Sequence, residues 1–180
     1  MAAFGRLILV RGLVMYPVRL GYLTAISRIT ALLKNGHDAE ALVAATFTVE
    51  KTLRRTLREL VISSGFASKI ADRLVGNLRG LEAVKGSWDI YDPKSRKLTD
   101  LLCQEDWRLF KECAEMRNKM VHGERVYDLA DCKKRAEAVL TALNRTKALF
   151  DQEYGYSGWT TASKRIKPRL HADPRVLVAP

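Results

Sequence analysis

Apolar residues recur at steps of three and four along most of this chain, and no sustained alternation of apolar and polar residues is present. This spacing is typical of amphipathic helices, whereas half-buried strands would need the alternating pattern. The stripes therefore predict an all-α fold. We expect about five helices. The first opens at Pro17 and stops at Asn35-Gly36, and the second follows Asp38 and closes at Ser63-Ser64-Gly65. The third spans about residues 68–84, the fourth about 104–121, and the fifth follows Asp128 and ends before Gly155.

Residues with strong terminal preferences stand at most of the predicted helix ends. Pro17 suits a first helical position, and Asn35-Gly36 should end that helix. Asp38 and Asp128 suit the N-caps of the second and fifth helices, because a carboxylate there accepts hydrogen bonds from free backbone N–H groups. Gly123 suits the left-handed position that follows the fourth helix. These residues indicate where the chain turns between helices.

The longest irregular connection that we predict inside the helical region spans residues 86–99, where Asp92-Pro93 marks a turn. The other connections are short, which favours an up-and-down bundle with antiparallel neighbours. We divide the chain into an N-terminal basic and apolar segment (residues 1–16), a helical bundle (17–154) and a basic C-terminal tail (155–180). With 180 residues and 47% hydrophobic content, the chain can bury one core.

The net charge of +11 is concentrated at the two ends of the chain. Residues 1–37 carry +5 and residues 155–180 carry +4, whereas residues 38–154 carry only +2. Basic ends favour a polyanion such as RNA, through phosphate contacts that weaken with salt. The alternative is a solvated surface that keeps the protein soluble.

Three cysteines, Cys103, Cys113 and Cys132, form no CxxC pair and no cluster with histidine. Their odd number argues against a disulfide scaffold, and we expect Cys113 and Cys132 to be buried thiols in a reducing compartment. We expect neither a metal site nor a cofactor. The apolar run Leu7–Tyr16 is interrupted by Arg11 and is too short to span a bilayer, so we expect a cytoplasmic protein without a membrane partner.

The predicted fourth helix places a charged side chain among apolar ones. At about 100° per residue, Arg117 falls near the middle of the apolar arc, Asn118 lies at its edge, and His122 lies on the same side as Asn118. A buried guanidinium is costly unless it is paired, so Arg117 should meet a carboxylate, with Glu50 as a candidate, or a partner. The arc itself comprises Trp107, Phe110, Cys113, Ala114, Met120 and Val121.

The run RNKMVHG, residues 117–123, resembles the signature of the HEPN superfamily, in which an arginine, a polar residue and three further residues precede a histidine near the end of a helix. Arg117, Asn118 and His122 occupy the three marked positions here. Helix number, helix order and motif placement extend the resemblance over roughly residues 17–154. Only the seven-residue run is specific.

The resemblance implies a metal-independent endoribonuclease, a toxin or antiviral-defence effector, whose site forms across a homodimer. On that basis His122 is the general acid or base, Arg117 neutralises charge on the scissile phosphate, and Asn118 orients it. An antitoxin or other inhibitory protein partner is also expected. The alternative is a non-catalytic HEPN-like helical module that binds RNA or a protein partner in a larger assembly.

One departure from the family pattern concerns regulation. Family members that a partner nucleotidyltransferase controls often carry a tyrosine two residues after the histidine, and Glu124 stands there in this chain. Control through that residue is therefore not expected. Secondary RNA-binding candidates are Trp88 and Tyr91, near the basic residues Lys94, Arg96 and Lys97 of the connection, although we favour a tryptophan that anchors the connection to the bundle. The tail residues near Trp159 allow the same two interpretations; they are Lys164, Arg165, Lys167 and Arg169.

Overall fold

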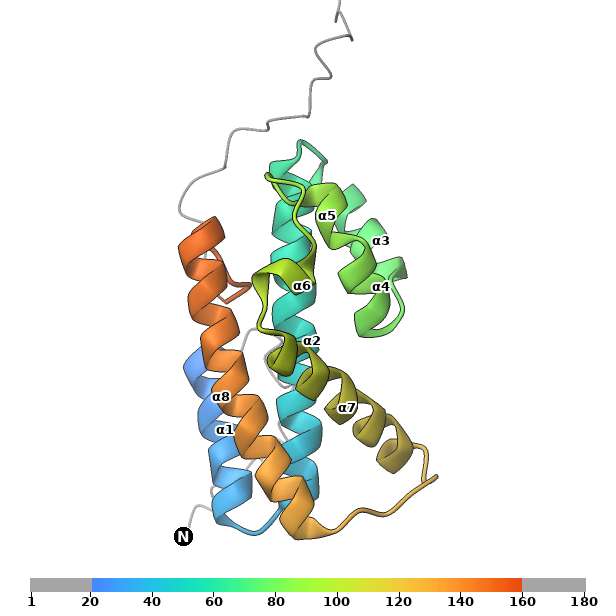
Figure 1. Cartoon of the computed structure of the whole chain (residues 1–180), viewed down its shortest axis with the longest axis vertical. Helices are drawn as coiled ribbons and strands as arrows, with labels where there is room; N and C mark the ends of the chain where they lie inside the picture. The colour runs from blue at the N-terminus through green and yellow to red at the C-terminus, as the bar shows by residue number, and fades with distance from the viewer. Residues whose placement is uncertain (1–20, 160–180) are drawn as a thin grey trace, which may run out of the picture.

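The computed structural model describes residues 21–159, which form eight α-helices and contain no strand (Figure 1). The all-α prediction is confirmed, but the prediction of five helices is wrong, because the region between the second and fourth predicted helices folds into four short ones. The predicted helix start at Pro17 lies outside the described residues. The helices are α1 (Tyr22–Lys34), α2 (Asp38–Ser63), α3 (Ser68–Asn77), α4 (Gly80–Gly86), α5 (Trp88–Tyr91), α6 (Leu98–Leu101), α7 (Gln104–Val121) and α8 (Leu129–Tyr154).

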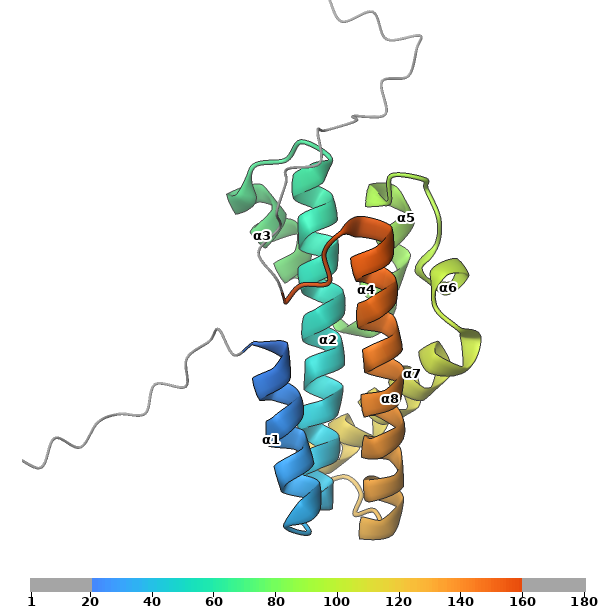
Figure 2. The same cartoon turned by 90° about the vertical axis from the view of Figure 1, so that its left-hand side faces the viewer.

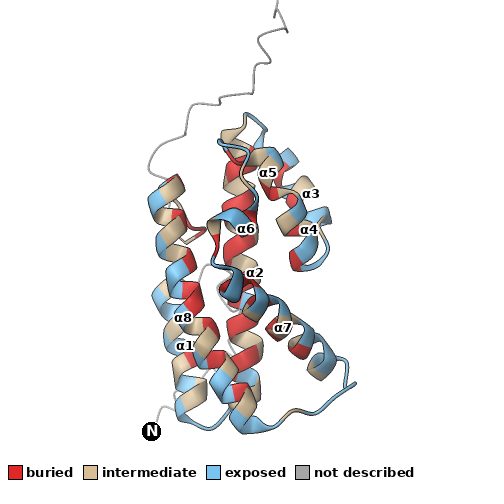
Figure 3. Cartoon of the chain, viewed as in Figure 1, coloured by how far each residue is buried: buried red, intermediate tan, exposed pale blue. Residues whose placement is uncertain are grey.

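Helix α2 is the centre of the fold, and α1, α3, α7 and α8 all pack against it. Figures 1 and 2 show α2 and α8 side by side and running in the same direction, whereas α1 runs in the opposite direction. The arrangement therefore departs from the strictly up-and-down expectation. Buried side chains line the facing sides of these helices (Figure 3). They include Leu42, Val49, Leu53, Leu57, Val139, Leu143 and Phe150.

The single helix that the sequence predicts over residues 68–84 is broken into α3 and α4. Leu78 leaves the helical region with a ψ of 127°, and Gly80 has a φ of +71°. Arg54 of α2 stabilises this end, because its guanidinium donates hydrogen bonds to the carbonyl groups of Val75 and Leu78 over 3.1 and 3.0 Å. A long-range partner thus satisfies carbonyl groups that a continuous helix would have used internally.

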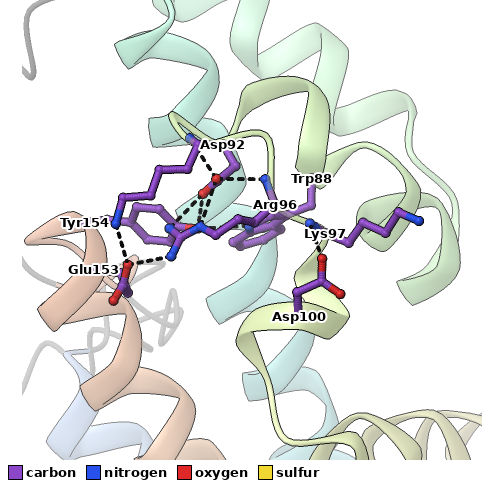
Figure 4. A network of polar contacts seen from close by, with 8 residues as sticks. Trp88, Asp92, Arg96, Lys97, Asp100, Glu153 and Tyr154 are labelled. Carbon is purple, nitrogen blue, oxygen red and sulfur yellow. Dashed lines mark hydrogen bonds and ion pairs between the residues drawn. The ribbon is translucent and has the colours of Figure 1, made fainter.

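The connection predicted over residues 86–99 contains α5 and the start of α6, joined through a network around Asp92 (Figure 4). Asp92 is fully buried, and its carboxylate accepts hydrogen bonds from the backbone N–H groups of Lys94 and Arg96. The Arg96 guanidinium and the Tyr154 hydroxyl also donate to it, and Trp88 Nε1 donates to the Tyr154 oxygen. The network ties this connection to the C-terminal end of α8.

The structure has most of the predicted helix ends, but the N-cap of α2 lies one residue earlier than predicted. Asp128 caps α8, since its carboxylate accepts hydrogen bonds from the N–H groups of the second and third helical residues. Gly123 has the expected positive φ, +68°. The prediction that Asp38 is the N-cap of α2 is wrong, because His37 occupies that position and Asp38 is the first helical residue. A carboxylate in the first turn still interacts favourably with the helix dipole.

After α8 the chain folds back across α2. Gly155 ends α8 in the left-handed conformation, and Ser157 is fully buried. Gly158 has a φ of +84°, and its carbonyl oxygen accepts a hydrogen bond from Arg55 Nη1 over 3.1 Å. The Trp159 indole N–H donates to Thr52 Oγ1 over 2.8 Å. Residues 155–159 therefore form a latch, by which we mean this five-residue segment and its contacts with α2.

Candidate functional site

Arg117 lies on the side of α7 that faces α2, in its second-last turn. Its Nη2 donates a hydrogen bond to Glu50 Oε1 of α2, and the two groups form an ion pair. The Arg117 side chain is 22% exposed and the Glu50 side chain 17%. The pairing with Glu50 that the sequence suggested is confirmed. The Arg117 Nε is buried and has no hydrogen-bond partner, so the guanidinium is only partly satisfied within one copy of the chain.

The other side of Arg117 borders an open groove of about 760 Å³, which we call the α1/α2/α7 groove. Arg117, Met120 and Val121 of α7 form one wall, and α1 contributes the opposite wall. Between them lies one face of α2. The lining residues from α1, α2 and the latch are Ala25, Arg28, Ile29, Leu32, Ala39, Glu40, Val43, Ala44, Phe47, Thr48, Lys51 and Trp159.

His122 is the C-cap of α7, and its backbone N–H donates to the carbonyl oxygen of Asn118 over 3.0 Å. Asn118 and His122 are both exposed, and within residues 21–159 neither side chain makes a hydrogen bond or an ion pair. Arg117 instead contacts α2. Within one copy of the chain, the Arg117 side chain therefore shares no hydrogen bond or ion pair with the side chains of Asn118 and His122.

The apolar arc predicted for α7 is correct in its N-terminal half. Trp107, Phe110 and Cys113 are buried, together with Met116, which the predicted arc did not include. Val121 was placed on the same arc but is 64% exposed. The reason lies in packing, because Figure 1 shows α7 diverging from α8 toward its C-terminal end. The last turn of α7 therefore keeps an apolar face that the described residues do not cover.

Trp159, which the sequence selected only as a neighbour of the basic tail residues, lies at the border of the groove. The Lys51 ammonium lies 5.2 Å from its ring centroid, and the Arg55 guanidinium lies at the same distance. Tyr22 packs edge-on against it, with ring centroids 5.6 Å apart. Burial and the neighbouring Arg55 charge lower the pKa of Lys51. The latch thus adds an aromatic ring, next to two cations of α2, beside the surface that Arg117 borders.

The secondary aromatic candidates do not form a stacking surface. Trp88 is fully buried, stacks on Phe150 at 5.2 Å and anchors the connection, which is the structural alternative that the sequence allowed. Tyr91 is half-buried and packs edge-on against Phe66. Arg96 is committed to Asp92 and Glu153. The basic tail residues Lys164, Arg165, Lys167 and Arg169 lie outside the described residues.

The thiols and acidic groups offer no metal site in the described part of the chain. Cys113 and Cys132 are buried as predicted, and Cys103 is exposed. Residues 21–159 contain no group of three His, Cys, Asp or Glu side chains placed to hold a metal ion. No helix in the same range is long and apolar enough to cross a bilayer.

Comparisons of the chain with protein-family models, curated proteins and solved structures found no match. A functional argument therefore depends on the residues themselves. The observations that bear on it are the half-satisfied Arg117, the exposed Asn118 and His122 at the end of the same helix, and the open groove beside them.

Proposed function

We propose that this protein is a metal-independent endoribonuclease of HEPN type that acts as a homodimer. The observation that carries the proposal is the incomplete state of the motif in one copy. Arg117 borders an open groove with an unpartnered Nε, whereas His122 is exposed at the end of α7. Residues five apart on a helix diverge by about 140°. Two copies that meet near the end of α7 would bring an arginine and a histidine to one phosphate.

In this mechanism the ribose 2′-hydroxyl attacks the adjacent phosphorus. A bond forms between phosphorus and the 2′-oxygen, the bond from phosphorus to the 5′-oxygen breaks, and a 2′,3′-cyclic phosphate remains. As general base, His122 takes the 2′-hydroxyl proton while water protonates the leaving 5′-oxygen; as general acid, it protonates that oxygen while water takes the 2′-hydroxyl proton. Arg117 stabilises the negative charge that develops on the phosphoryl oxygens, and Asn118 orients the phosphate. The expected second product therefore carries a 5′-hydroxyl end.

The alternative is a non-catalytic HEPN-like module that binds RNA or a protein partner, and the Arg117–Glu50 ion pair favours it. An arginine that is paired with a carboxylate already has a structural role, because a partly buried guanidinium needs a counter-charge. On this alternative the ion pair with Glu50 is the role of Arg117. His122 then caps the helix, where a cation interacts favourably with the helix dipole.

The two functions separate in a cleavage assay on labelled RNA in the presence of EDTA. We expect the wild-type protein to cut and His122→Ala to cut at least about 100-fold more slowly, the usual contribution of a general acid or base. His37→Ala is the matched control, since His37 is also exposed but lies in the α1–α2 turn. Sedimentation velocity should show that all three proteins remain dimeric. Equal cutting by wild type and His122→Ala would refute the proposal.

A complementation assay tests whether the site is shared between subunits. Arg117→Ala and His122→Ala are prepared separately, mixed, and allowed to exchange subunits. If each site takes its arginine from one subunit and its histidine from the other, every mixed dimer keeps one intact site. Because about half of randomly mixed dimers are mixed, about one quarter of wild-type activity should return. No recovery after demonstrated exchange contradicts a site shared in this way.

The structural contribution of Arg117 is measured separately by a double-mutant cycle with Glu50. Both side chains are mostly buried but border an open groove, so the interaction energy should lie near the upper end for exposed pairs, about 1 kcal/mol. Urea unfolding of Glu50→Gln, Arg117→Met and the double variant gives this value. A large coupling energy combined with no His122-dependent cutting would favour the non-catalytic module.

A further inference from the structure

One face of α2 forms the floor of the α1/α2/α7 groove and carries an exposed aromatic side chain. From Glu40 onward, the α2 residues that line the groove recur at steps of three, one, three, one and three, which keeps them on one side of the helix. Phe47, near the middle of this set, is 58% exposed, and Val121 in the α7 wall is 64% exposed. Together they give the groove an apolar surface of the kind that another molecule covers. We call the α2 set the α2 stripe; it consists of Glu40, Val43, Ala44, Phe47, Thr48 and Lys51.

The spacing of the α2 stripe is symmetric about its own middle. A two-fold axis that is perpendicular to α2 and passes midway between Ala44 and Phe47 lays a second α2 antiparallel on the first. That operation sets Ala44 opposite Phe47 of the second copy, and Val43 opposite Thr48. Each position of the stripe therefore meets another position of the same stripe, so the surface is compatible with an interface between two identical copies.

The two charged residues of the stripe have opposite signs and stand at its opposite ends. Glu40 is exposed in the first turn of α2, and Lys51 follows eleven residues later, about 17 Å along the helix axis. Within residues 21–159 neither side chain forms an ion pair, although the Lys51 ammonium lies near the Trp159 ring. The same two-fold axis brings Glu40 of each copy to Lys51 of the other. A second copy matches the separation of the two charges because its own stripe has that separation.

Side-chain size at the centre of the stripe is complementary in the same alignment. Phe47 is exposed, whereas Ala44, about one turn earlier, has a side chain of a single carbon. The two-fold axis places the large ring of each copy against the small residue of the other, which suits packed helices whose axes are 8–10 Å apart. The stripe thus carries the complement of its own charges and of its own shape. An unrelated helix would have to reproduce both at the same spacing, so the stripe selects a second copy.

Two other cations border the groove but do not select its occupant. Arg117 is paired with Glu50, and Arg28 has an interaction of its own within the chain. The complementarity of the stripe depends on neither of them. The last turn of α7 does contribute, because Val121 lines the same groove and directly precedes His122. A molecule that covers the stripe therefore extends to the apolar turn beside the motif.

We propose that two copies of this chain dimerise through the α1/α2/α7 groove, with their α2 stripes antiparallel and Glu40 of each copy paired with Lys51 of the other. The motif of each copy then lies at the edge of the interface, where the proposed nuclease requires a second copy. The role of this dimer in catalysis rests on the proposed function. The face and the register rest on the α2 stripe alone.

A charge exchange in the full chain tests the register. Glu40→Lys and Lys51→Glu are purified separately, and sedimentation velocity over a concentration series measures the dimer dissociation constant. Each variant puts like charges together at both ends of the paired stripes, so each should dimerise at least about tenfold more weakly than the wild type. An equimolar mixture regains opposite charges at both ends. Its mixed dimers, like the dimer of the double variant, should return to within about threefold of the wild-type affinity.

Matched controls place the same changes outside the groove. Lys69→Glu on α3 and Glu137→Lys on α8 reverse exposed charges and should leave dimerisation unchanged. Phe47→Glu should weaken the dimer by at least about 100-fold, because the two-fold axis repeats the loss of a central aromatic contact. Ile90→Glu is its control, since Ile90 is 62% exposed on α5 and does not line the groove. Thermal unfolding of each variant establishes that it is folded.

A wild-type chain that stays monomeric at every concentration would overturn the proposal and leave the groove to a segment outside residues 21–159 or to another protein. A dimer that Glu40→Lys, Lys51→Glu and Phe47→Glu all leave unchanged would place the interface elsewhere. Failure of the mixed variants to recover would contradict the antiparallel register. RNA cutting by the same proteins is scored separately. Rescue of the dimer by charge exchange without any cutting refutes the nuclease alone, whereas cutting by dimers that none of these variants weakens refutes the interface alone.

Discussion

Asp92 offers the sharpest quantitative test of the fold, through the substitution Asp92→Asn. The carboxylate is fully buried and accepts five hydrogen bonds (Figure 4). Three reach Oδ2, from the Lys94 N–H at 2.9 Å, the Arg96 N–H at 3.0 Å and the Arg96 Nε at 3.2 Å. Two reach Oδ1, from the Tyr154 hydroxyl at 2.7 Å and the Arg96 Nη2 at 3.2 Å. All five donors converge on one group that has no proton to donate.

The amide of asparagine keeps one acceptor oxygen and replaces the other with an NH₂ group. That group would face donors, so two or three of the five bonds are lost. A hydrogen bond to a charged group contributes about 1.5–3 kcal/mol. The Arg96 side chain remains 25% exposed and keeps its contact with Glu153, so water and this second carboxylate reduce the loss. We therefore expect a destabilisation of about 3 kcal/mol and, at 2–4 °C per kcal/mol for a chain of this size, a fall in Tm of about 6–12 °C.

The effect should depend on pH in a defined direction. Burial alone raises the pKa of Asp92, but hydrogen bonds from Arg96, Tyr154 and the Lys94 backbone outweigh it and hold that pKa below its usual value. A carboxyl group with a lowered pKa in the folded state contributes stability above its unfolded pKa, about 3.9, and loses it as the pH falls through the folded value. The difference between wild type and Asp92→Asn should be constant from pH 7 to about pH 5 and narrow below about pH 4.

Urea unfolding followed by far-ultraviolet circular dichroism, repeated at several pH values, measures both quantities. Asp100→Asn is the matched control, because Asp100 is exposed and accepts a bond only from the Lys97 N–H at 3.2 Å. Its effect should stay below about 1 kcal/mol. Tyr154→Phe removes one of the five donors and should fall between the two. If Asp92→Asn costs less than about 1 kcal/mol at pH 7, or if its effect grows on acidification, the reasoning from the network is refuted.

Three further outcomes follow from the structure. Asp128→Ala should destabilise the protein by about 1 kcal/mol in urea unfolding, because α8 loses its N-cap, and an unchanged midpoint would contradict that role. In the native protein at pH 8 a thiol reagent should label the exposed Cys103 rapidly and the buried Cys113 and Cys132 slowly. Burial raises the pKa of both buried thiols, for Cys113 to about 11. Equal labelling rates for all three thiols would contradict the packing. Gly158→Ala should lower the free energy of unfolding by about 1–3 kcal/mol, because the new Cβ would lie 2.7 Å from the Cβ of Arg55 and φ is +84°. A tryptophan fluorescence spectrum and a stability like those of the wild type would contradict this expectation.

The helices that the sequence predicted best are those whose signals are local. The fourth helix, predicted over about residues 104–121, coincides with α7. The second and fifth helices, predicted to follow caps at Asp38 and Asp128 and to end near Ser63 and before Gly155, lie close to α2 and α8. Each combines a long apolar stripe with polar or glycine residues at its ends, and both features act over a few residues. Asp128 is the clearest case, because its cap involves only neighbouring backbone groups.

The features that the sequence did not predict depend on partners distant in the chain. The break before Gly80 is stabilised by Arg54, which lies 21 residues or more away from the carbonyl groups that it binds. The latch depends on a bond between Trp159 and Thr52, 107 residues apart. No periodicity encodes such a contact, because the residues become neighbours only after α2 and α8 have packed. A tryptophan and two glycines beyond a helix end were the available local signals, and they are also typical of an unstructured tail.

Arg117 shows that the sequence can predict the apolar stripe of a helix without predicting which surface covers it. The apolar face of α7 is longer than the surface that α2 covers, since Met116 is buried whereas Val121 is 64% exposed. Arg117 lies between these two residues, so one end of its guanidinium meets Glu50 while its flank borders the groove. The pairing with Glu50 explains how the charge is tolerated, but it does not explain why apolar residues continue beyond it. An uncovered apolar turn loses the free energy of burial unless another surface covers it. The end of α7 is therefore where a second copy of this chain, which the proposed nuclease requires, must be sought.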